Sequence, residues 1–238
     1  METYLFQGIV YPQRAPITIA FKQGLQHLGS GRLVSADVSI LLNQITVWIE
    51  SEDKWDVFDL RNLVRNLVQN NLGIFGYLTG LAYDLEITRV ICRSRSIDQV
   101  FGIDIPCISE RNSKIDVNER LASILPKIDG MEGVLFNRCF NDLNMAMKSA
   151  EDTGFYCYRA IESLRQHCRL KFDFPEEDRS GQWQKLREIA NTDEATIRKI
   201  KSAADTVRHG GHLHVTSENR ADLFNLTWGI VDAYIDNV

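Results

Sequence analysis

What the sequence lacks narrows the classes of protein that it can encode. No uninterrupted apolar run approaches the roughly 18 residues that a membrane-spanning helix needs, and the first residues show no signal-peptide pattern. There is no internal repeat and no low-complexity segment. The five cysteines include no C-x-x-C pair and are odd in number. We therefore expect reduced thiols in a cytoplasmic protein that does not associate with a membrane.

The chain has fewer basic than acidic residues, with 27 Lys and Arg against 32 Asp and Glu, which gives a net charge of −5. This balance argues against a general nucleic-acid coat and against a binder of anionic membranes. It leaves room for a local basic patch, since residues 159–208 carry eleven Lys or Arg and nine Asp or Glu. With 238 residues, 44% of them hydrophobic, the chain can form one large domain or two ordinary ones.

The first part of the chain, residues 1–110, is expected to be an α+β domain with a mainly antiparallel sheet and one helix. Short runs rich in β-branched and aromatic residues predict strands at 4–10, 17–21, 38–42, 45–49, 81–92 and 99–108. Asn43-Gln44 is a candidate hairpin turn between two of them. From Asp56 onward apolar residues recur every three or four positions, which predicts a helix capped by Asp56 and ended by Gly73.

The second part, residues 111–238, is expected to be an all-α bundle that begins with a polar linker near residues 109–118. Apolar residues at helical spacing predict helices at 134–149, 153–170, 183–190, 192–207 and 218–236. Thr216 or Ser217 can cap the last helix. Apolar residues cover more than one stripe of that helix, so it should be buried on two sides, either by its own bundle or by a partner subunit.

The segment from Asp205 to His214 is the strongest candidate for a chemical site. It places Arg208 and three of the five histidines around the pair Gly210-Gly211. On one continuous helix Arg208 and His214 would lie roughly 240° apart and could not meet. Glycine often follows a helix C-terminus, because the chain must turn there through positive φ. We predict a helix that ends near Arg208 and a tight turn that folds His214 back toward the guanidinium.

An arginine and a histidine held together suit acid–base chemistry on a phosphodiester. An imidazole can take the proton from a ribose 2′-OH or return one to a leaving 5′-oxygen. The guanidinium of Arg208 stays charged and can bind a phosphate through a bidentate fork. It could then stabilise the extra negative charge of a phosphorane-like transition state.

The Arg-x5-His sequence of residues 208–214, followed by the last helix, resembles the motif of the HEPN domain family, a compact helical domain with Arg-x4–6-His in that place. His209 matches the polar residue that often follows the arginine in that family. The helix around Tyr158 and Glu162 is similar to the family's aromatic and acidic helix that faces the motif. The resemblance covers roughly residues 134–238 and leaves the N-terminal part unexplained.

The resemblance implies a metal-independent endoribonuclease without a cofactor, which cleaves RNA to a 2′,3′-cyclic phosphate and a 5′-hydroxyl. It implies a homodimer formed through the helical domain, with two copies of the motif facing one cleft, and a toxin or phage-defence role. The implied catalytic residues are Arg208, His214, His209 and Glu162. His209 would orient the phosphate, and Glu162 would hold Arg208 or a histidine in place.

Other interpretations of the same residues stay open. Arg208 can be a cation that complements the dipole of its helix. The three histidines of the motif can be surface residues, or zinc ligands without an obvious fourth partner. Arg159 or Arg165 could face the cleft in place of Glu162. The helical domain could instead be a non-catalytic module that binds RNA or a nucleotide or only dimerises, or an adaptor on a larger partner, while residues 1–110 select a target or sense a signal.

Overall fold

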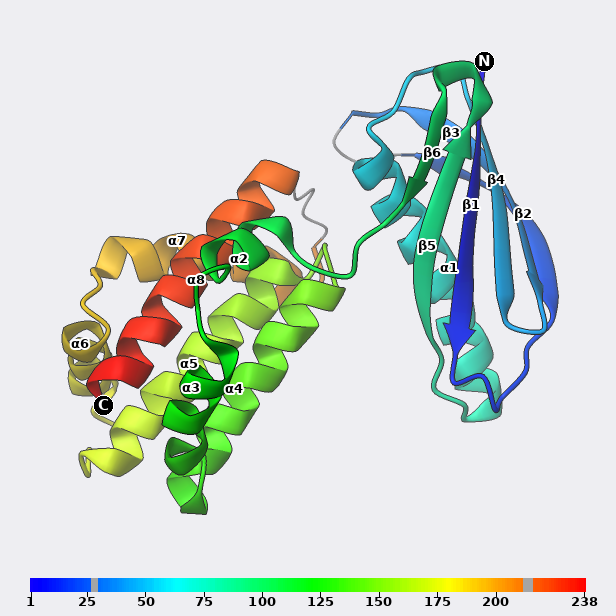
Figure 1. Ribbon diagram of the computed structural model, residues 1–238. Coiled ribbons are helices and arrows are strands. Elements are labelled where there is room, and N and C mark those ends of the chain that lie inside the picture. Colours follow the sequence, from blue (N-terminus) through cyan, green and yellow to red (C-terminus); the bar gives the residue numbers. More distant parts are fainter. Residues whose placement is uncertain (27–29, 212–215) are drawn as a thin grey trace. The chain divides into compact units, whose positions relative to one another are not determined.

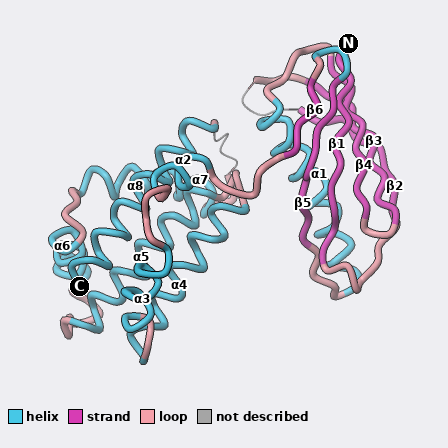
Figure 2. Tube along the Cα trace, viewed as in Figure 1, coloured by secondary structure: helices cyan, strands magenta, loops and turns pink. Residues whose placement is uncertain are grey.

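The computed structural model describes residues 1–26, 30–211 and 216–238. They form two compact units, Met1–Ile103 and Asp104–Val238, so the division lies ahead of the boundary expected at residue 110. The chain has the predicted α+β layout, in which the first unit holds the strands and the second unit is helical (Figure 1; Figure 2). No helix among the residues described is both long and apolar enough to cross a bilayer.

The N-terminal unit is an antiparallel sheet of six strands in the order β2-β3-β4-β1-β5-β6. The strands are β1 (Glu2–Tyr11), β2 (Ile19–Gln26), β3 (Leu33–Leu41), β4 (Gln44–Ser51), β5 (Asp84–Cys92) and β6 (Ile97–Val100), with a short 3-10 turn η1 (Arg93–Arg95) before β6. Every second residue of β1 is buried, as in Tyr4, Phe6 and Val10. This period of two turns one face of the sheet toward helix α1 (Val57–Thr79), and the shared core lies between them (Figure 1).

The hairpin between β3 and β4 turns one residue earlier than the sequence suggested. Leu42 and Asn43 occupy the turn with φ of 47° and 70°, whereas Gln44 already belongs to β4. Two positive φ values are typical of a type I′ turn, which matches the twist of the flanking strands. The Asn43 side chain also accepts a hydrogen bond from the Ile17 backbone N–H at 2.7 Å, so tertiary contacts support the left-handed conformation.

Helix α1 begins as predicted but runs beyond Gly73. Asp56 caps its first turn by accepting hydrogen bonds from the backbone of Phe58 and Asp59. A glycine inside a helix costs about 1 kcal/mol and does not by itself force a turn. The helix ends instead at Gly80, whose φ is 72°. The expected end at Gly73 was therefore wrong.

The C-terminal unit consists of helices and their connections. They are α2 (Pro106–Arg111), α3 (Val117–Ile124), the 3-10 turn η2 (Leu125–Lys127), α4 (Gly130–Lys148), α5 (Thr153–Lys171), α6 (Arg179–Ile189), α7 (Glu194–Arg208) and α8 (Ser217–Asn237). The strand expected at 99–108 was wrong beyond Val100, because Pro106 opens α2. Proline suits a first helical position, where its missing N–H has no partner to lose. The linker expected at 109–118 lies inside the C-terminal unit, where residues 112–116 connect α2 to α3.

Helix α5 is the centre of this unit and packs against α4, α6, α7 and α8. Helix α8 contacts α2, α5, α6 and α7, so its second covered side comes from its own bundle. Of the two residues that could cap α8, Thr216 does so, because its hydroxyl accepts a hydrogen bond from the Asn219 backbone at 3.1 Å. The Thr216 cap thus fixes the start of α8 at Ser217, immediately after the motif segment.

Candidate active site

Helix α7 ends at Arg208 and is closed by the predicted glycine turn. The Gly210 N–H donates to the carbonyl of Val207 at 3.0 Å, and the Gly211 N–H donates to that of Thr206 at 2.9 Å. These two bonds, with Gly210 at a φ of 76°, form a Schellman motif. The expectation that the helix ends near Arg208 with a tight glycine turn is therefore confirmed.

Arg208 and His209 both lie exposed at this helix end. The nearest carboxylate to Arg208 is that of Asp205, one turn earlier, with 3.9 Å between Nη1 and Oδ1. An exposed pair at this distance holds a guanidinium weakly, so Arg208 can exchange Asp205 for a phosphate oxygen. The guanidinium also lies at the C-terminal end of α7, where it complements the helix dipole. A role in phosphate binding and a role in complementing the dipole are therefore compatible for Arg208.

His212 and His214 lie outside the described residues. The predicted meeting of Arg208 with His214, and the alternative zinc site of three histidines, therefore both fall on residues without a described position. Within residues 1–26, 30–211 and 216–238, no group of three or more His, Cys, Asp or Glu is arranged to hold a metal ion.

Glu162 lies on α5, which approaches α7 closely. A Cβ on Gly154 of α5 would lie 2.8 Å from the Cβ of Ala203 on α7, so only glycine permits this separation of the two helices. Tyr158 of α5 is buried and stacks on Trp183 of α6, with ring centroids 6.2 Å apart. Close packing thus brings the acidic helix and the end of α7 to one region.

The charges of Glu162 and Arg208 both affect the pKa of the Tyr158 hydroxyl. Burial raises its pKa, the carboxylate of Glu162 raises it further, and the guanidinium of Arg208 lowers it. Coulombic effects of this kind fall off with distance, so Glu162 on α5 and Arg208 on α7 both lie within electrostatic range of this hydroxyl. Of the four residues proposed from sequence, the structure describes Glu162 on α5 and Arg208 and His209 at the end of α7.

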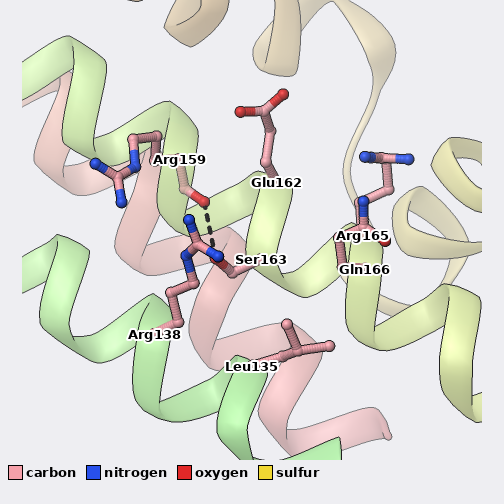
Figure 3. Close-up of a pocket in the computed structure, with 7 residues that line it drawn as sticks. All are labelled: Leu135, Arg138, Arg159, Glu162, Ser163, Arg165 and Gln166. Atoms are coloured by element: carbon pink, nitrogen blue, oxygen red, sulfur yellow. Dashed lines mark hydrogen bonds between the residues drawn. The ribbon is translucent and has the colours of Figure 1, made fainter.

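A hollow on the outer side of α4 and α5 adjoins this region (Figure 3). Its volume is about 220 Å³. We call it the arginine hollow, and it is lined by Leu135, Arg138, Arg159, Glu162, Ser163, Arg165 and Gln166. Glu162 therefore belongs both to the arginine hollow and to the surroundings of Tyr158.

The sequence interpretation raised Arg159 and Arg165 as alternatives to Glu162 and missed Arg138. Glu162, Arg159 and Arg165 all line the same hollow. Arg138 lies on α4, whose apolar positions alone were used to place that helix. A signal was available, since Arg138 follows the half-buried Leu135 by three residues and so shares its face of the helix.

Other reactive side chains of this unit are unsuited to catalysis. Burial raises the pKa of Cys157 to about 11 and also raises the pKa of Cys168, which keeps both thiols protonated. His167 is 2% exposed and hydrogen-bonds the Tyr234 hydroxyl through Nδ1 at 2.7 Å. These residues are part of the core, which leaves the exposed motif as the candidate site.

Comparison with known proteins gives family matches over most of the chain. Residues 4–101 match the N-terminal domain and residues 121–238 the C-terminal domain of a pair described as domain of unknown function (DUF8168). The two matches fall within the two units of the structure. No curated protein and no solved structure matches the chain.

Proposed function

Because this chain belongs to the DUF8168 family, whose domains carry no assigned function, we propose its activity from the chemistry of the helical unit. We propose a metal-independent endoribonuclease of the HEPN type. The observation that carries the proposal is the exposed Arg208 at a Schellman turn, at the end of a helix that packs against α5, the helix of Glu162.

In the proposed reaction His214 takes the proton of a ribose 2′-OH, and the 2′-oxygen attacks the adjacent phosphorus. The P–O5′ bond breaks, the 5′-oxygen leaves with the proton that His214 accepted, and the products are a 2′,3′-cyclic phosphate and a 5′-hydroxyl. Arg208 holds the phosphate and stabilises the negative charge of the transition state. His209 orients the phosphate, and Glu162 acts as a positioning residue for Arg208.

The test is cleavage of single-stranded RNA by the full chain in the presence of EDTA. We expect cleavage to be lost in Arg208→Ala and in His214→Ala while the helical content stays unchanged. Arg198→Ala is the matched control, because Arg198 lies on the same helix and pairs only with Glu194 among the described residues, at 2.5 Å. Cleavage that survives either motif substitution would remove the assignment.

A non-catalytic RNA-binding module is the second candidate, and the arginine hollow favours it independently of the motif. Three guanidinium groups and one carboxylate line that hollow. A lining with more positive than negative groups can bind the phosphates of RNA whether or not the motif cleaves it. RNA binding with no cleavage product, in the wild type and in both motif variants, would select this candidate.

Homodimerisation is part of the proposal because the HEPN resemblance implies two motifs in one cleft. Sedimentation of the full chain tests it, and a strict monomer at micromolar concentration would contradict a composite cleft.

A further inference from the structure

The arginine hollow has the charge of an anion site. Arg138, Arg159 and Arg165 line it together with Glu162, and the buried Asp142 carboxylate pairs with Arg159 at 3.2 Å, which leaves an excess of one positive charge. Ser163 is already engaged, since its hydroxyl donates to the Arg159 carbonyl at 3.1 Å. At about 220 Å³ the hollow is smaller than the roughly 300 Å³ at which pockets for whole small molecules begin. It fits phosphate and sugar better than a complete nucleotide.

Two of the three guanidinium groups are fixed before any ligand arrives. Arg159 lies 3.2 Å from the buried carboxylate of Asp142, and its guanidinium carbon is 5.4 Å from the centre of the Phe155 ring and 5.7 Å from that of Tyr156. Cations fixed in this way lose little conformational entropy on binding.

Arg165 is 8% exposed, hydrogen-bonds Gln182 and lies 5.5 Å from the centre of the Trp183 ring. Its Nε is buried and has no hydrogen-bond partner among the described residues. Burial also lowers the pKa of Arg165, because its charge is only partly compensated, although an arginine stays protonated. A nearby anion would compensate this charge.

The three cations are spread along the hollow and do not converge on one point (Figure 3). Arg138 extends from α4 toward Ser163 on α5, whereas Arg159 and Arg165 leave α5 in opposite directions with Glu162 between them. Several separated cations match a chain of phosphates better than one free phosphate, because each guanidinium can neutralise a different group.

We propose that the arginine hollow binds the sugar–phosphate backbone of single-stranded RNA. The inference rests on the proposed function and names the part of the substrate that the α4–α5 face recognises. Glu162, a residue of the proposed active site, also lines the hollow. The contacts are to phosphates, so they give affinity and register without base preference.

The experiment measures how salt weakens RNA binding by the full chain. Fluorescence anisotropy follows a labelled single-stranded RNA, with His214→Ala as the background so that the probe stays intact. Each phosphate contact contributes about 0.7 to the slope of log K against log salt for a single strand. We expect Arg138→Ala to reduce this slope by about 0.7, while Arg198→Ala leaves it unchanged. Arg138 is exposed on α4, so its removal leaves the fold intact.

Three outcomes would overturn the inference. Equal slopes for Arg138→Ala and Arg198→Ala would show that the hollow does not contact RNA. Inorganic phosphate that binds through Arg138, with an unchanged RNA slope, would make a free anion the ligand. Polyglutamate of equal charge that binds as tightly as RNA through Arg138 would make an acidic peptide the ligand.

Failure of this inference is distinguishable from failure of the proposed function. RNA cleavage that depends on Arg208 and His214, with an unchanged slope in Arg138→Ala, would leave the nuclease assignment intact and remove the hollow. A slope that falls in Arg138→Ala, without any cleavage by the wild type, would keep the hollow and remove the nuclease assignment.

Discussion

His167 makes the stability of the helical unit depend on pH. It lies on α5 at 2% exposure, 2.7 Å from the Tyr234 hydroxyl and with its ring centroid 4.5 Å from that of Phe136. Burial lowers its pKa from 6.5 to about 4, while Glu132, whose Oε2 is 4.0 Å from Nε2, opposes the shift. The folded unit therefore holds this imidazole neutral at pH values where the unfolded chain protonates it.

The sign and size of the effect follow from this difference in pKa. A histidine with a lowered pKa in the folded state contributes stability that is present above pH 6.5 and is lost as the pH falls from 6.5 toward 4. Each pKa unit corresponds to about 1.4 kcal/mol. Between pH 7 and pH 5 the loss attributable to His167 is therefore about 2 kcal/mol.

The assay is urea unfolding of the full chain at pH 7, 6 and 5, followed by far-UV circular dichroism. His167→Gln removes the titrating group and keeps a side-chain oxygen that can accept from Tyr234. We expect wild type to lose about 2 kcal/mol more than His167→Gln between pH 7 and 5. Parallel pH profiles for wild type and His167→Gln would refute the reasoning.

Three further substitutions test the site and its support. Glu162→Gln should tighten RNA binding about threefold, because a carboxylate leaves the arginine hollow, and slow cleavage about tenfold in single-turnover kinetics. Gly210→Ala should cost about 1–2 kcal/mol in urea unfolding from its φ of 76° alone, since a Cβ there meets no atom within 4 Å. Gly154→Ala should cost about 1–3 kcal/mol by forcing α5 from Ala203, whereas the uncrowded Gly229→Ala should be neutral or stabilising; equal effects would contradict the close approach.

The secondary structure of the helical unit was largely predictable because its signals are local. Apolar residues at steps of three and four placed α4, α5, α7 and α8 within a few residues of their ends, and Gly210 marked the end of α7. Prediction of helix and strand ends failed where the local sequence is compatible with two conformations. Gly73 is tolerated inside α1, and the run before Pro106 was apolar but too short to distinguish a strand from a loop and a helix start.

The sequence by itself determined the alternation of the sheet, the helical periodicity and the glycine turn after Arg208, because backbone conformation depends mainly on neighbouring residues. Only the tertiary structure decided that Arg138 joins Arg159 and Arg165 around one hollow and that Glu162 shares an electrostatic environment with Arg208. The residues concerned lie on different helices. Their distances depend on packing, such as the approach of Gly154 to Ala203, which no spacing along the chain encodes.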